Sequence, residues 1–446
     1  MYVKTQTFLV LGVSKSGYAV SKHIILNGGK CYIYEQLSNI KIENSIVELV
    51  DMGAIRLKDS DVDAMLSIID VLVISPGVPI NHEVAVKAKR LGKRIIGELE
   101  YGYINFTPPI IAVTGTNGKT TTVTMLYEIF ERQGLCSHLV GNVGTPLSEK
   151  ICDVSKNDIV VAEVSSFQLE STNAFCPHVS CITNIAPDHL ERHYSMENYI
   201  FLKKRIFKNQ KESEYCVLNF DDKVIRAFYT EIKAKVVWIS LLEEVDGAYR
   251  KDGKLYYYDQ IIMEEKDLKV RGDHNVYDAL FAIASACIMG VDVSTIKSAL
   301  QDFKGVKHRI EHVCEKNGIE FYNDSKATNT TSTISAIDSM TKPTVLILGG
   351  SEKGEKYEEL FEKIKISPIK HVVLTGASRY KMLDCAGRVG YANLTLTASF
   401  DHAVKIANMV AERGECVLLS PACASFDNFD GYQARGESFK AIVEGL

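Results

Sequence analysis

Residues 110–130 read IIAVTGTNGKTTTVTMLYEIF, and this stretch decides the fold of the chain around it. An apolar strand pattern ends at Gly115, a turn of small residues follows, and an amphipathic helix pattern begins at Lys119. Gly118 lets a phosphate approach the backbone closely, and the helix start directs free N–H groups at the same point. Lys119 can reach terminal phosphates and the Thr120 hydroxyl can bind Mg²⁺, so we predict a phosphate-binding loop.

The spacing of this loop departs from the strict pattern, which has a glycine five residues before Gly118, where this chain has Val113. The alternative interpretation is an ordinary strand–helix turn with an exposed lysine. Because a strand pattern precedes the turn and a helix pattern follows it, the phosphate-binding interpretation is favoured.

Similar apolar strands alternate with helix patterns along most of the chain. Strands that are apolar on both faces are typical of parallel sheets covered by helices, so we predict an α/β fold. The clearest strands are 8–13, 30–35, 71–75, 110–115, 158–164, 179–184, 235–240, 343–350, 371–376 and 416–420. The 446 residues suggest about three domains at ~150 residues each. We place the boundaries near residues 97 and 305.

Composition excludes several classes of protein. Hydrophobic residues make up 46% and charged residues 24% of the chain, which excludes a largely disordered protein. The net charge of −5 argues against a broad nucleic-acid-binding surface. The sequence has no apolar run of ~20 residues that would cross a membrane. We see no signal peptide, and the 11 cysteines include no CxxC pair. Their spacing suits buried thiols better than a disulfide framework or a zinc site, so we expect a cytoplasmic protein.

Two polar residues follow the phosphate loop at positions that suit a metal site. Glu163 lies in the apolar strand 158–164, where a buried carboxylate is costly unless it is paired or bound to a cation. His189 follows the next strand and stands beside Asp188. For His189, a helix-capping or surface role and a metal-binding role are about equally supported by the sequence.

Lys203 lies in a predicted helix, 198–209, and differs from the two basic residues that follow it. The residues at i−4, i−3, i+3 and i+4 from Lys203 are all large and apolar: Tyr199, Ile200, Ile206 and Phe207. Lys203 is therefore placed on the buried face, where the pKa of its amine should fall. A neutral amine can take up CO₂ to form an anionic carbamate that binds metal. The alternative is a lysine that extends past its neighbours into solvent.

The N-terminal turn GVSKSG, residues 12–17, follows a strand and is similar to a dinucleotide-binding fingerprint. Ser14 replaces the middle glycine, which weakens the match. Glu35 ends the second strand at about the position of a ribose-binding acid. An NAD-dependent dehydrogenase is therefore one alternative, supported by residues 8–35 alone.

Three motifs together resemble a known family. TGTNGKTTT (114–122), VAEVSSFQLE (161–170) and APDHLERH (186–193) are similar to motifs of the Mur ligases, the ATP-dependent amide-forming enzymes of peptidoglycan synthesis. NDSKATN (323–329) and SPACASFDNFDGY (420–432) narrow the resemblance to the ligases that add D-glutamate. The resemblance covers essentially the whole chain.

The resemblance implies a fold of three domains. A Rossmann-like domain, 1–97, would bind the UDP substrate, a central P-loop-type ATPase domain, 98–305, would bind ATP, and a Rossmann-like domain, 306–446, would bind the amino acid. ATP would phosphorylate the carboxylate of UDP-N-acetylmuramoyl-L-alanine (UDP-MurNAc-L-Ala), and D-glutamate would then attack the acyl phosphate. The protein would act as a monomer in the cytoplasm, with no nucleic-acid or membrane partner.

The resemblance also assigns roles to individual residues. The catalytic residues would be Lys119, Glu163, His189 and Lys203. The ligands of two Mg²⁺ ions would be Thr120, Glu163, His189 and a carbamylated Lys203. ATP would contact Gly115, Thr116, Asn117, Gly118, Lys119, Thr120, Thr121, Asn275, Arg309 and Asp324. The UDP substrate would contact Ser16, Glu35, Ser75, Pro76, Gly77, Asn142, Gln168 and His189. D-glutamate would contact Thr328, Lys353, Ser425, Phe426 and Tyr432.

One position departs from the family pattern. Asp278 stands three residues after Asn275, where a second asparagine is expected beside the adenine ring. A carboxylate cannot donate to the ring as an amide can, so the role of Asp278 stays open.

Three other functions are alternatives. The first is a neighbouring Mur ligase or a folylpolyglutamate synthase-like ligase, which would differ in the amino acid or the acceptor. The second is a non-catalytic nucleotide-binding regulator on the same scaffold, although such a binder has no need for two metal sites. The third is the dehydrogenase named above.

Overall fold

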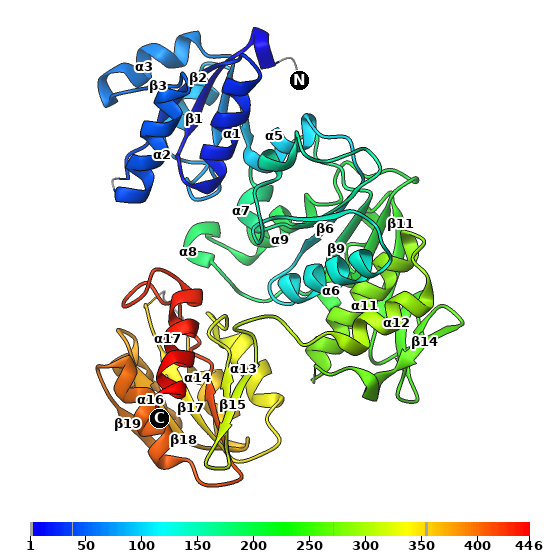
Figure 1. Cartoon of the computed structure of the whole chain (residues 1–446), viewed down its shortest axis with the longest axis vertical. Helices are drawn as coiled ribbons and strands as arrows, with labels where there is room; N and C mark the ends of the chain where they lie inside the picture. Colours follow the sequence, from blue (N-terminus) through cyan, green and yellow to red (C-terminus); the bar gives the residue numbers. More distant parts are fainter. Residues whose placement is uncertain (1–2, 38, 271, 353–355) are drawn as a thin grey trace. The chain divides into compact units, whose positions relative to one another are not determined.

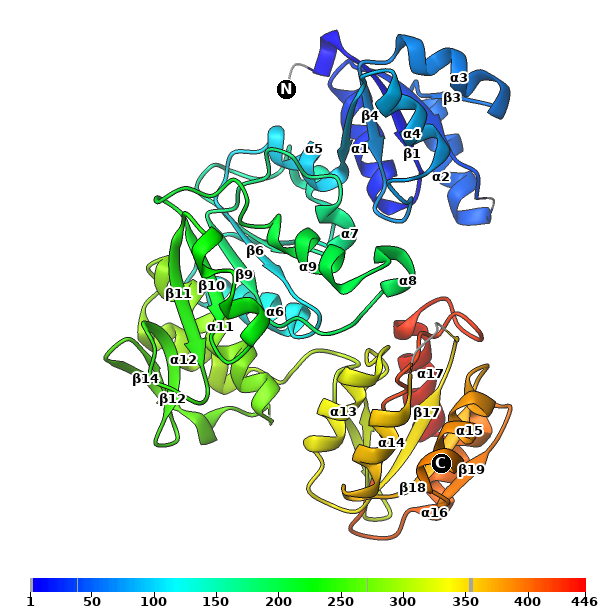
Figure 2. The ribbon, with the colours of Figure 1, turned by 180° about the vertical axis from the view of Figure 1, so that it is seen from behind.

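The computed structural model describes residues 3–37, 39–270, 272–352 and 356–446. Packing divides the chain into two compact units. The first unit runs to Asp267 and includes Tyr277–Gln301, and the second consists of Leu268–Val276 and Asp302–Leu446. The first unit contains two sheets and the second contains one (Figures 1 and 2).

The first sheet is fully parallel, with the strand order β3-β2-β1-β4-β5. Its strands are β1 (Thr7–Leu11), β2 (Lys30–Tyr34), β3 (Ile55–Arg56), β4 (Val71–Ile74) and β5 (Arg94–Gly97). Its helices are α1 (Lys15–Leu26), α2 (Ile40–Asp51), α3 (Asp59–Ile68), α4 (Glu83–Arg90) and α5 (Glu98–Ile104), after a short 3₁₀ turn at Val3–Thr5. Alternate residues of β1 face opposite sides: Phe8 and Val10 pack with α1 and α2, and Leu9 and Leu11 pack with α3 and α4.

The second sheet has nine strands in the order β14-β13-β12-β11-β10-β9-β6-β8-β7. The parallel strands are β6 (Ile110–Thr114), β7 (Ser137–Gly141), β8 (Ile159–Glu163), β9 (Val179–Ile182), β10 (Tyr215–Asn219) and β11 (Lys235–Ser240). An antiparallel meander extends the sheet through β12 (Gly247–Lys251), β13 (Lys254–Tyr257) and β14 (Gln260–Glu264).

The helices of the second sheet are α6 (Lys119–Arg132), α7 (Ser166–Leu169), α8 (Leu190–His193), α9 (Met196–Lys204), α10 (Lys223–Arg226), α11 (Asp273–Ile288) and α12 (Val293–Asp302). Short 3₁₀ turns lie at Leu147–Lys150, Tyr229–Glu231 and Glu265–Asp267. Ile110 and Ala112 of β6 belong to the apolar cluster that includes Ile206 and Phe207. On the opposite face, Cys181 of β9 contacts Ser285 of α11. Both faces of the sheet are therefore covered by helices, as the apolar strands predict.

The third sheet forms the core of the second unit, with the strand order β15-β16-β20-β17-β18-β19. Its strands are β15 (Glu311–Lys316), β16 (Ile319–Asn323), β17 (Thr344–Gly349), β18 (Ile369–Thr375), β19 (Leu394–Leu396) and β20 (Cys416–Leu419). Helices α13 (Thr330–Asp338), α14 (Glu358–Lys365) and α15 (Arg379–Val389) cover one face. Helices α16 (Phe400–Val410) and α17 (Tyr432–Glu444) cover the other. The late strand β20 lies between β16 and β17.

The structure also bears on membrane-spanning helices and on the cysteines. Among the described residues, none of the helices combines the length and apolar character needed to span a bilayer. All 11 cysteines are free thiols, and most of them are fully or partly buried. The sequence analysis is wrong for Cys136 and Cys152, which are exposed.

Candidate active site

The predicted phosphate loop lies at the carboxyl end of β6, between that strand and α6. Gly115 has φ +143° and Gly118 has φ +84°, which disfavour residues with a side chain. A Cβ added at Gly118 would lie 2.2 Å from an oxygen of Asp278, and one at Gly115 would lie 1.8 Å from the Thr183 hydroxyl. The two glycines are therefore required both by backbone conformation and by space.

A second loop, which follows β9, holds the phosphate loop in place. The Asn117 N–H donates to the Asn184 side chain at 2.9 Å, and the Asn184 amide donates back to the Asn117 carbonyl at 3.1 Å. The Thr116 hydroxyl donates to the Ala186 carbonyl at 3.0 Å. These bonds order the loop before any ligand arrives.

Lys119 is the first residue of α6, and its side chain folds back over the loop. Its ammonium donates to the carbonyls of Gly115 at 2.9 Å and Thr116 at 2.7 Å. A cation is thus held at the helix N-terminus, where an anion is also attracted by the helix dipole. A phosphate at this helix start would compete with the two carbonyls for the Lys119 ammonium.

Glu163 ends β8 and is 1% exposed. One carboxylate oxygen accepts a hydrogen bond from the Thr120 hydroxyl at 2.6 Å, and the other accepts from the Asn142 amide at 2.7 Å. The Asn142 N–H also donates to the Glu163 carbonyl at 2.8 Å. The pairing of Val113 with Glu163 brings the carboxylate beside the phosphate loop.

This group of oxygen ligands fits a magnesium ion. Mg²⁺ prefers hard oxygen ligands and is usually bound by one or two carboxylates, a hydroxyl and water. The Thr120 hydroxyl and the Glu163 carboxylate already lie in contact at 2.6 Å. Thr120 and Glu163 could therefore hold the first predicted ion.

Lys203 lies in α9 with its side chain 1% exposed, as the sequence predicts. Its Nζ donates to the Gly115 carbonyl at 2.7 Å and lies 4.6 Å from the centre of the Tyr199 ring. Burial lowers the pKa of Lys203 well below its usual value, and the nearby Lys119 lowers it further. Asp188 and Glu163 oppose these effects. Lys203 therefore shares the surroundings of the phosphate loop and of Glu163.

His189 takes the N-cap position of α8 with φ +53°, but its side chain makes no capping hydrogen bond. The imidazole lies 3.7 Å from the Asp188 carboxylate and packs on the ring of Phe167, with 5.0 Å between ring centres. A third of the side chain is exposed. The ring is thus oriented by neighbours while part of it stays accessible to a ligand.

Asp278 lies in α11 and faces the start of α6. It is buried, and one carboxylate oxygen accepts from the Thr122 hydroxyl at 3.4 Å. The carboxyl group therefore lies beside the N-terminal turn of α6.

Three predicted nucleotide contacts belong to the second unit. Arg309 lies near Asp324 and His274, and His274 is adjacent to Asn275. Burial lowers the pKa of His274 to about 4, and the nearby Arg309 lowers it further. Burial is the largest effect on Asp324 and raises its pKa to about 7. Asp324 accepts hydrogen bonds from the Ser420 hydroxyl at 2.6 Å and the Ile310 N–H at 3.2 Å.

The predicted D-glutamate residues also lie in the second unit, apart from Lys353, which is outside the described residues. Tyr432 begins α17, and its hydroxyl accepts from Lys326 at 3.3 Å. Ser425 is buried, Thr328 is partly buried and Phe426 is 71% exposed. An exposed phenylalanine next to a buried serine suits a surface that covers a ligand.

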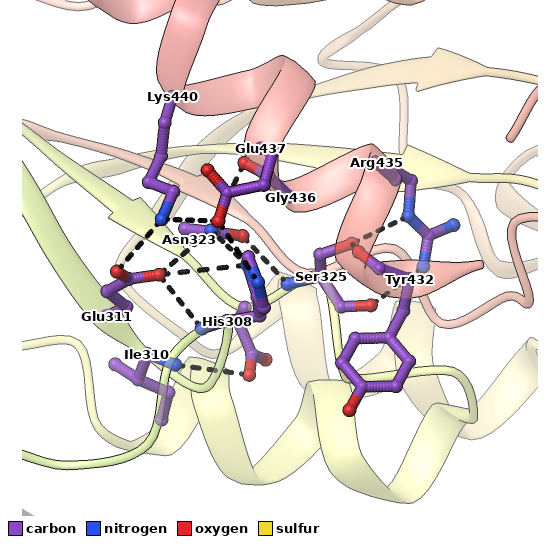
Figure 3. Close-up of polar contacts among 11 residues, drawn as sticks. His308, Ile310, Glu311, Asn323, Ser325, Tyr432, Arg435, Gly436, Glu437 and Lys440 are labelled. Carbon is purple, nitrogen blue, oxygen red and sulfur yellow. Dashed lines mark hydrogen bonds and ion pairs between the residues drawn. The ribbon is translucent and has the colours of Figure 1, made fainter. Parts of the chain in front are cut away.

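Sequence reasoning missed Arg435, which is 2% exposed and holds α17 to the sheet. Its guanidinium donates to the hydroxyl and the carbonyl of Ser325 at 2.9 and 2.8 Å (Figure 3). It also donates to the Cys423 carbonyl at 3.0 Å. Ser325 in turn donates to the Tyr432 carbonyl at 2.8 Å. Because this network joins the motifs 323–329 and 420–432, it positions the predicted D-glutamate residues.

Two family models match the chain: the Mur ligase middle domain at residues 113–286, and the Mur ligase, glutamate ligase domain at residues 308–423. Together they cover more than half of the chain and include the phosphate loop, Glu163, His189 and Lys203. The chain belongs to the Mur ligase family. The predictions of family, enzyme class and α/β fold are therefore confirmed, and ligases of this family use ATP.

Curated relatives match this Mur ligase over its full length. It is 41% identical over 450 residues to the UDP-N-acetylmuramoylalanine--D-glutamate ligase of Caldanaerobacter subterraneus subsp. tengcongensis, covering 100% of both chains. It is 38% identical over 455 residues to the enzyme of the same name from Clostridioides difficile, again covering 100% of both chains.

Solved Mur ligases share the fold. The UDP-N-acetylmuramate-alanine ligase MurC of Thermotoga maritima matches with a TM-score of 0.62 and 18% identity over 99% of both chains. MurF of Acinetobacter baumannii matches with a TM-score of 0.65 and 18% identity, over 97% of this chain and 93% of that one.

Five of the predicted UDP-substrate residues of this Mur ligase lie at the carboxyl end of the first sheet: Ser16, Glu35, Ser75, Pro76 and Gly77. The Glu35 carboxylate accepts hydrogen bonds from the N–H groups of Val13 at 2.7 Å and Leu37 at 2.8 Å. The buried Ser75 hydroxyl donates to the Gly12 carbonyl at 2.7 Å. Glu35 and Ser75 thus shape the turn that begins α1, where Ser16 is partly buried.

The remaining predicted substrate residues differ in burial. Pro76 is partly buried and Gly77 is exposed, just after β4. Gln168 is buried, and its amide oxygen accepts from the Ser165 N–H at 2.9 Å in a capping box that begins α7. This contact gives Gln168 a structural role that sequence reasoning did not assign.

Proposed function

We propose that this chain joins the amine of D-glutamate to the terminal carboxylate of UDP-MurNAc-L-Ala with hydrolysis of ATP to ADP and phosphate. The observation that carries the proposal is the buried Glu163 carboxylate, which contacts Thr120 beside a phosphate loop. Full-length similarity to ligases named for this reaction supports the choice of substrates.

The reaction needs an activated carboxylate, because a carboxylate is itself a poor electrophile. Transfer of the γ-phosphoryl group of ATP to a carboxylate oxygen breaks the β–γ phosphoanhydride bond and releases ADP. The amine then attacks the carbonyl carbon, the C–O bond to phosphate breaks, and the amine loses a proton to give the amide.

Side chains of this chain would serve the first step. Lys119 would leave its loop carbonyls and donate to the γ-phosphate, which offsets charge as the phosphoryl group transfers. Thr120 and Glu163 would hold one Mg²⁺, and His189 with carbamylated Lys203 would hold a second. Bound Mg²⁺ supplies charge neutralisation between the carboxylate and the phosphates. Asn142 would hold Glu163 in place, as its 2.7 Å hydrogen bond suggests.

Residues of the second unit would complete the site. Arg309 presents a permanently charged planar group suited to phosphate, with Asn275 and Asp324 near it for the nucleoside. Thr328, Lys353, Ser425, Phe426 and Tyr432 would bind D-glutamate. In the first sheet, Ser16, Glu35, Ser75, Pro76 and Gly77 would bind the UDP group. We also propose that the enzyme acts in the cytoplasm as a monomer, with these small molecules as its partners.

The decisive experiment measures ADP and phosphate release by the purified chain given ATP, Mg²⁺ and UDP-MurNAc-L-Ala, with D- and L-glutamate compared. We expect release with D-glutamate alone. Phosphate release with L-alanine, diaminopimelate or lysine, each with its own acceptor, would indicate a neighbouring Mur ligase. Phosphate release with a folate acceptor would indicate a folylpolyglutamate synthase-like ligase. ATP binding without turnover on any substrate would indicate a regulator. A change in nicotinamide absorbance would indicate a dehydrogenase.

A further inference from the structure

A cluster of three different metal-binding side chains lies at one edge of the second sheet. Cys136 precedes the edge strand β7, His138 lies in it, and Asp158 precedes β8. The Cys136 Sγ lies 3.6 Å from the His138 Nε2, which lies 2.9 Å from an Asp158 oxygen. All three ligand atoms lie within 4.8 Å of one another. Over the described ranges of the chain, no other group of three Cys, His, Asp or Glu meets this spacing.

The backbone holds the cluster in place. His138 pairs with Val160 in the parallel ladder, and the Ile159 N–H donates to the Cys136 carbonyl at 3.0 Å. The Asp158 carboxylate is oriented by the Ser155 N–H, which donates to it at 3.0 Å. Thus none of the three side chains depends on a long free loop for its position.

The distances suit a tetrahedral zinc ion. With Zn–S and Zn–N bonds of about 2.3 and 2.05 Å, tetrahedral geometry places sulfur and nitrogen about 3.6 Å apart. The observed Cys136–His138 separation is 3.6 Å. The Asp158 oxygen lies 2.9 Å from the imidazole nitrogen. It would have to move away by only about 0.5 Å to become the third ligand.

The local charge favours a cation. The Asp158 carboxylate belongs to the cluster, and the Glu131 carboxylate lies close to Cys136. Glu131 is fixed nearby by the Ser137 hydroxyl, which donates to it at 3.0 Å. Two carboxylates so close together attract a divalent ion by their charge.

The cluster is separate from the candidate active site. Cys136, His138 and Asp158 lie at the amino ends of β7 and β8, whereas Glu163 lies at the carboxyl end of β8. The five residue-to-residue steps from Asp158 to Glu163 along the extended strand span roughly 16 Å. An ion at the cluster therefore cannot also bind a nucleotide held at the phosphate loop.

We propose that Cys136, His138 and Asp158 form a zinc-binding site, with water as a fourth ligand. The bonds formed are Zn–Sγ, Zn–Nε2 and Zn–O. The thiol proton passes to solvent, and the imidazole keeps its proton on Nδ1. The bound ion joins the edge strand β7 to the start of β8, and so stabilises the strand that leads to Asn142.

The experiment uses the full chain, stripped of metal with a chelator and returned to excess Mg²⁺, and then titrated with Co²⁺. Oxygen ligands at the magnesium site give no thiolate charge-transfer band in the near ultraviolet, so this band reports cysteine ligation. We expect one thiolate-bound Co²⁺ per chain, displaced by Zn²⁺. Zn²⁺ alone should also raise the melting temperature.

Matched variants identify the ligands. Cys136→Ser should abolish the band and weaken zinc binding by roughly 100-fold or more. Cys152→Ser is the control, because Cys152 is the other exposed cysteine and lies outside the cluster. It should bind as the unmodified chain does. At the same Co²⁺ concentration, Asp158→Asn and His138→Asn should give a weaker thiolate band than the unmodified chain, or none.

Three results would overturn the proposal: no band in the unmodified chain, an unchanged band in Cys136→Ser, or loss of the band in Cys152→Ser alone. Phosphate release by Cys136→Ser should equal that of the unmodified chain. A chain that binds Co²⁺ through Cys136 but releases no phosphate would contradict the proposed ligase function and leave the zinc site standing.

Discussion

The Lys203 ammonium of α9 donates a 2.7 Å hydrogen bond to the Gly115 carbonyl, 88 residues earlier in the phosphate loop. The same carbonyl accepts from Lys119 at 2.9 Å. Two lysine side chains therefore meet at one oxygen. Burial lowers the pKa of Lys203 well below its usual value, and the nearby Lys119 lowers it further. This arrangement favours the neutral amine of Lys203, which is the form that reacts with CO₂.

Replacement of Lys203 tests the proposed carbamate. Lys203→Ala should lower the rate of phosphate release by about 100-fold or more, because a metal ligand is lost. Added short carboxylates should restore part of the activity by supplying the missing anion. Lys204→Ala is the matched control, since Lys204 pairs with Glu231 away from the loop, and it should keep the rate of the unmodified chain. Full activity of Lys203→Ala would exclude the proposed role.

Replacement of Lys119 separates chemistry from substrate binding. Lys119→Ala should abolish turnover, because the γ-phosphate loses the cation that offsets its charge in the transition state. Binding of UDP-MurNAc-L-Ala, measured by calorimetry without ATP, should change by less than a factor of about 3, since its proposed site is on the first sheet. Equal loss of both would point to misfolding, which circular dichroism would detect.

The backbone conformation of Gly118 in the phosphate loop can be tested by substitution. Gly118→Ala should destabilise the chain and weaken ATP binding, because φ is +84° and the new Cβ would lie 2.2 Å from Asp278. Gly134→Ala is the control at the other end of α6, where φ is +78° and nothing lies within 4 Å. The control should be destabilised only by the strain of an alanine in the left-handed conformation, about 1–2 kcal/mol. Equal melting temperatures for the two variants would contradict the clash.

Asp324 should make stability depend on pH. Its pKa is raised from 3.8 to about 7 by burial, so the folded chain binds a proton that the unfolded chain has lost between these values. Stability should therefore fall as pH rises from about 4 to 7, and level off above 7, by up to about 4 kcal/mol from this group. Asp324→Asn should flatten that part of the melting profile. An unchanged slope in the variant would mean that another group is responsible.

The distribution of the proposed ligands over two units predicts closure on binding. Lys119 and Glu163 lie in the first unit, and Arg309 and Asp324 lie in the second. A nucleotide that contacts all four would hold the two units to one another, so an ATP analogue and the UDP substrate should reduce the average radius of gyration in small-angle X-ray scattering. Identical scattering curves with and without ligands would oppose the assignment of Arg309 and Asp324 to the nucleotide site.

The parallel sheets could be predicted because their strands are apolar on both faces. The predicted strands at 110–115 and 158–164 match β6 and β8 to within a residue. The meander β12–β14 was missed because residues 247–264 mix tyrosines with charged residues and one face is exposed. The predicted helix 198–209 ends early, at Lys204, since the chain turns there to bury Ile206 and Phe207. The domain boundaries stay predictions, because packing divides the chain into two units.

The burial of Lys203 was also predicted from its apolar neighbours, although only Tyr199 and Ile200 share its helix and Ile206 and Phe207 follow the helix end. The structural roles of Gln168 and Asp278 were not predictable, because they depend on contacts with Ser165 in a capping box and with Thr122 of a different helix. The Cys136–His138–Asp158 cluster was missed for a similar reason: its third ligand is brought in by strand pairing.

The position of β20 has a consequence for synthesis of the protein. Residues 416–419 form the strand between β16 and β17. The facing edges of those two strands therefore have no partner until β20 inserts and pairs with both. A ribosome therefore produces almost a hundred residues of apolar strands and helices before their central partner exists. During that interval the exposed strand edges can pair with other chains. Overproduction should thus require chaperones that shield this part of the nascent polypeptide.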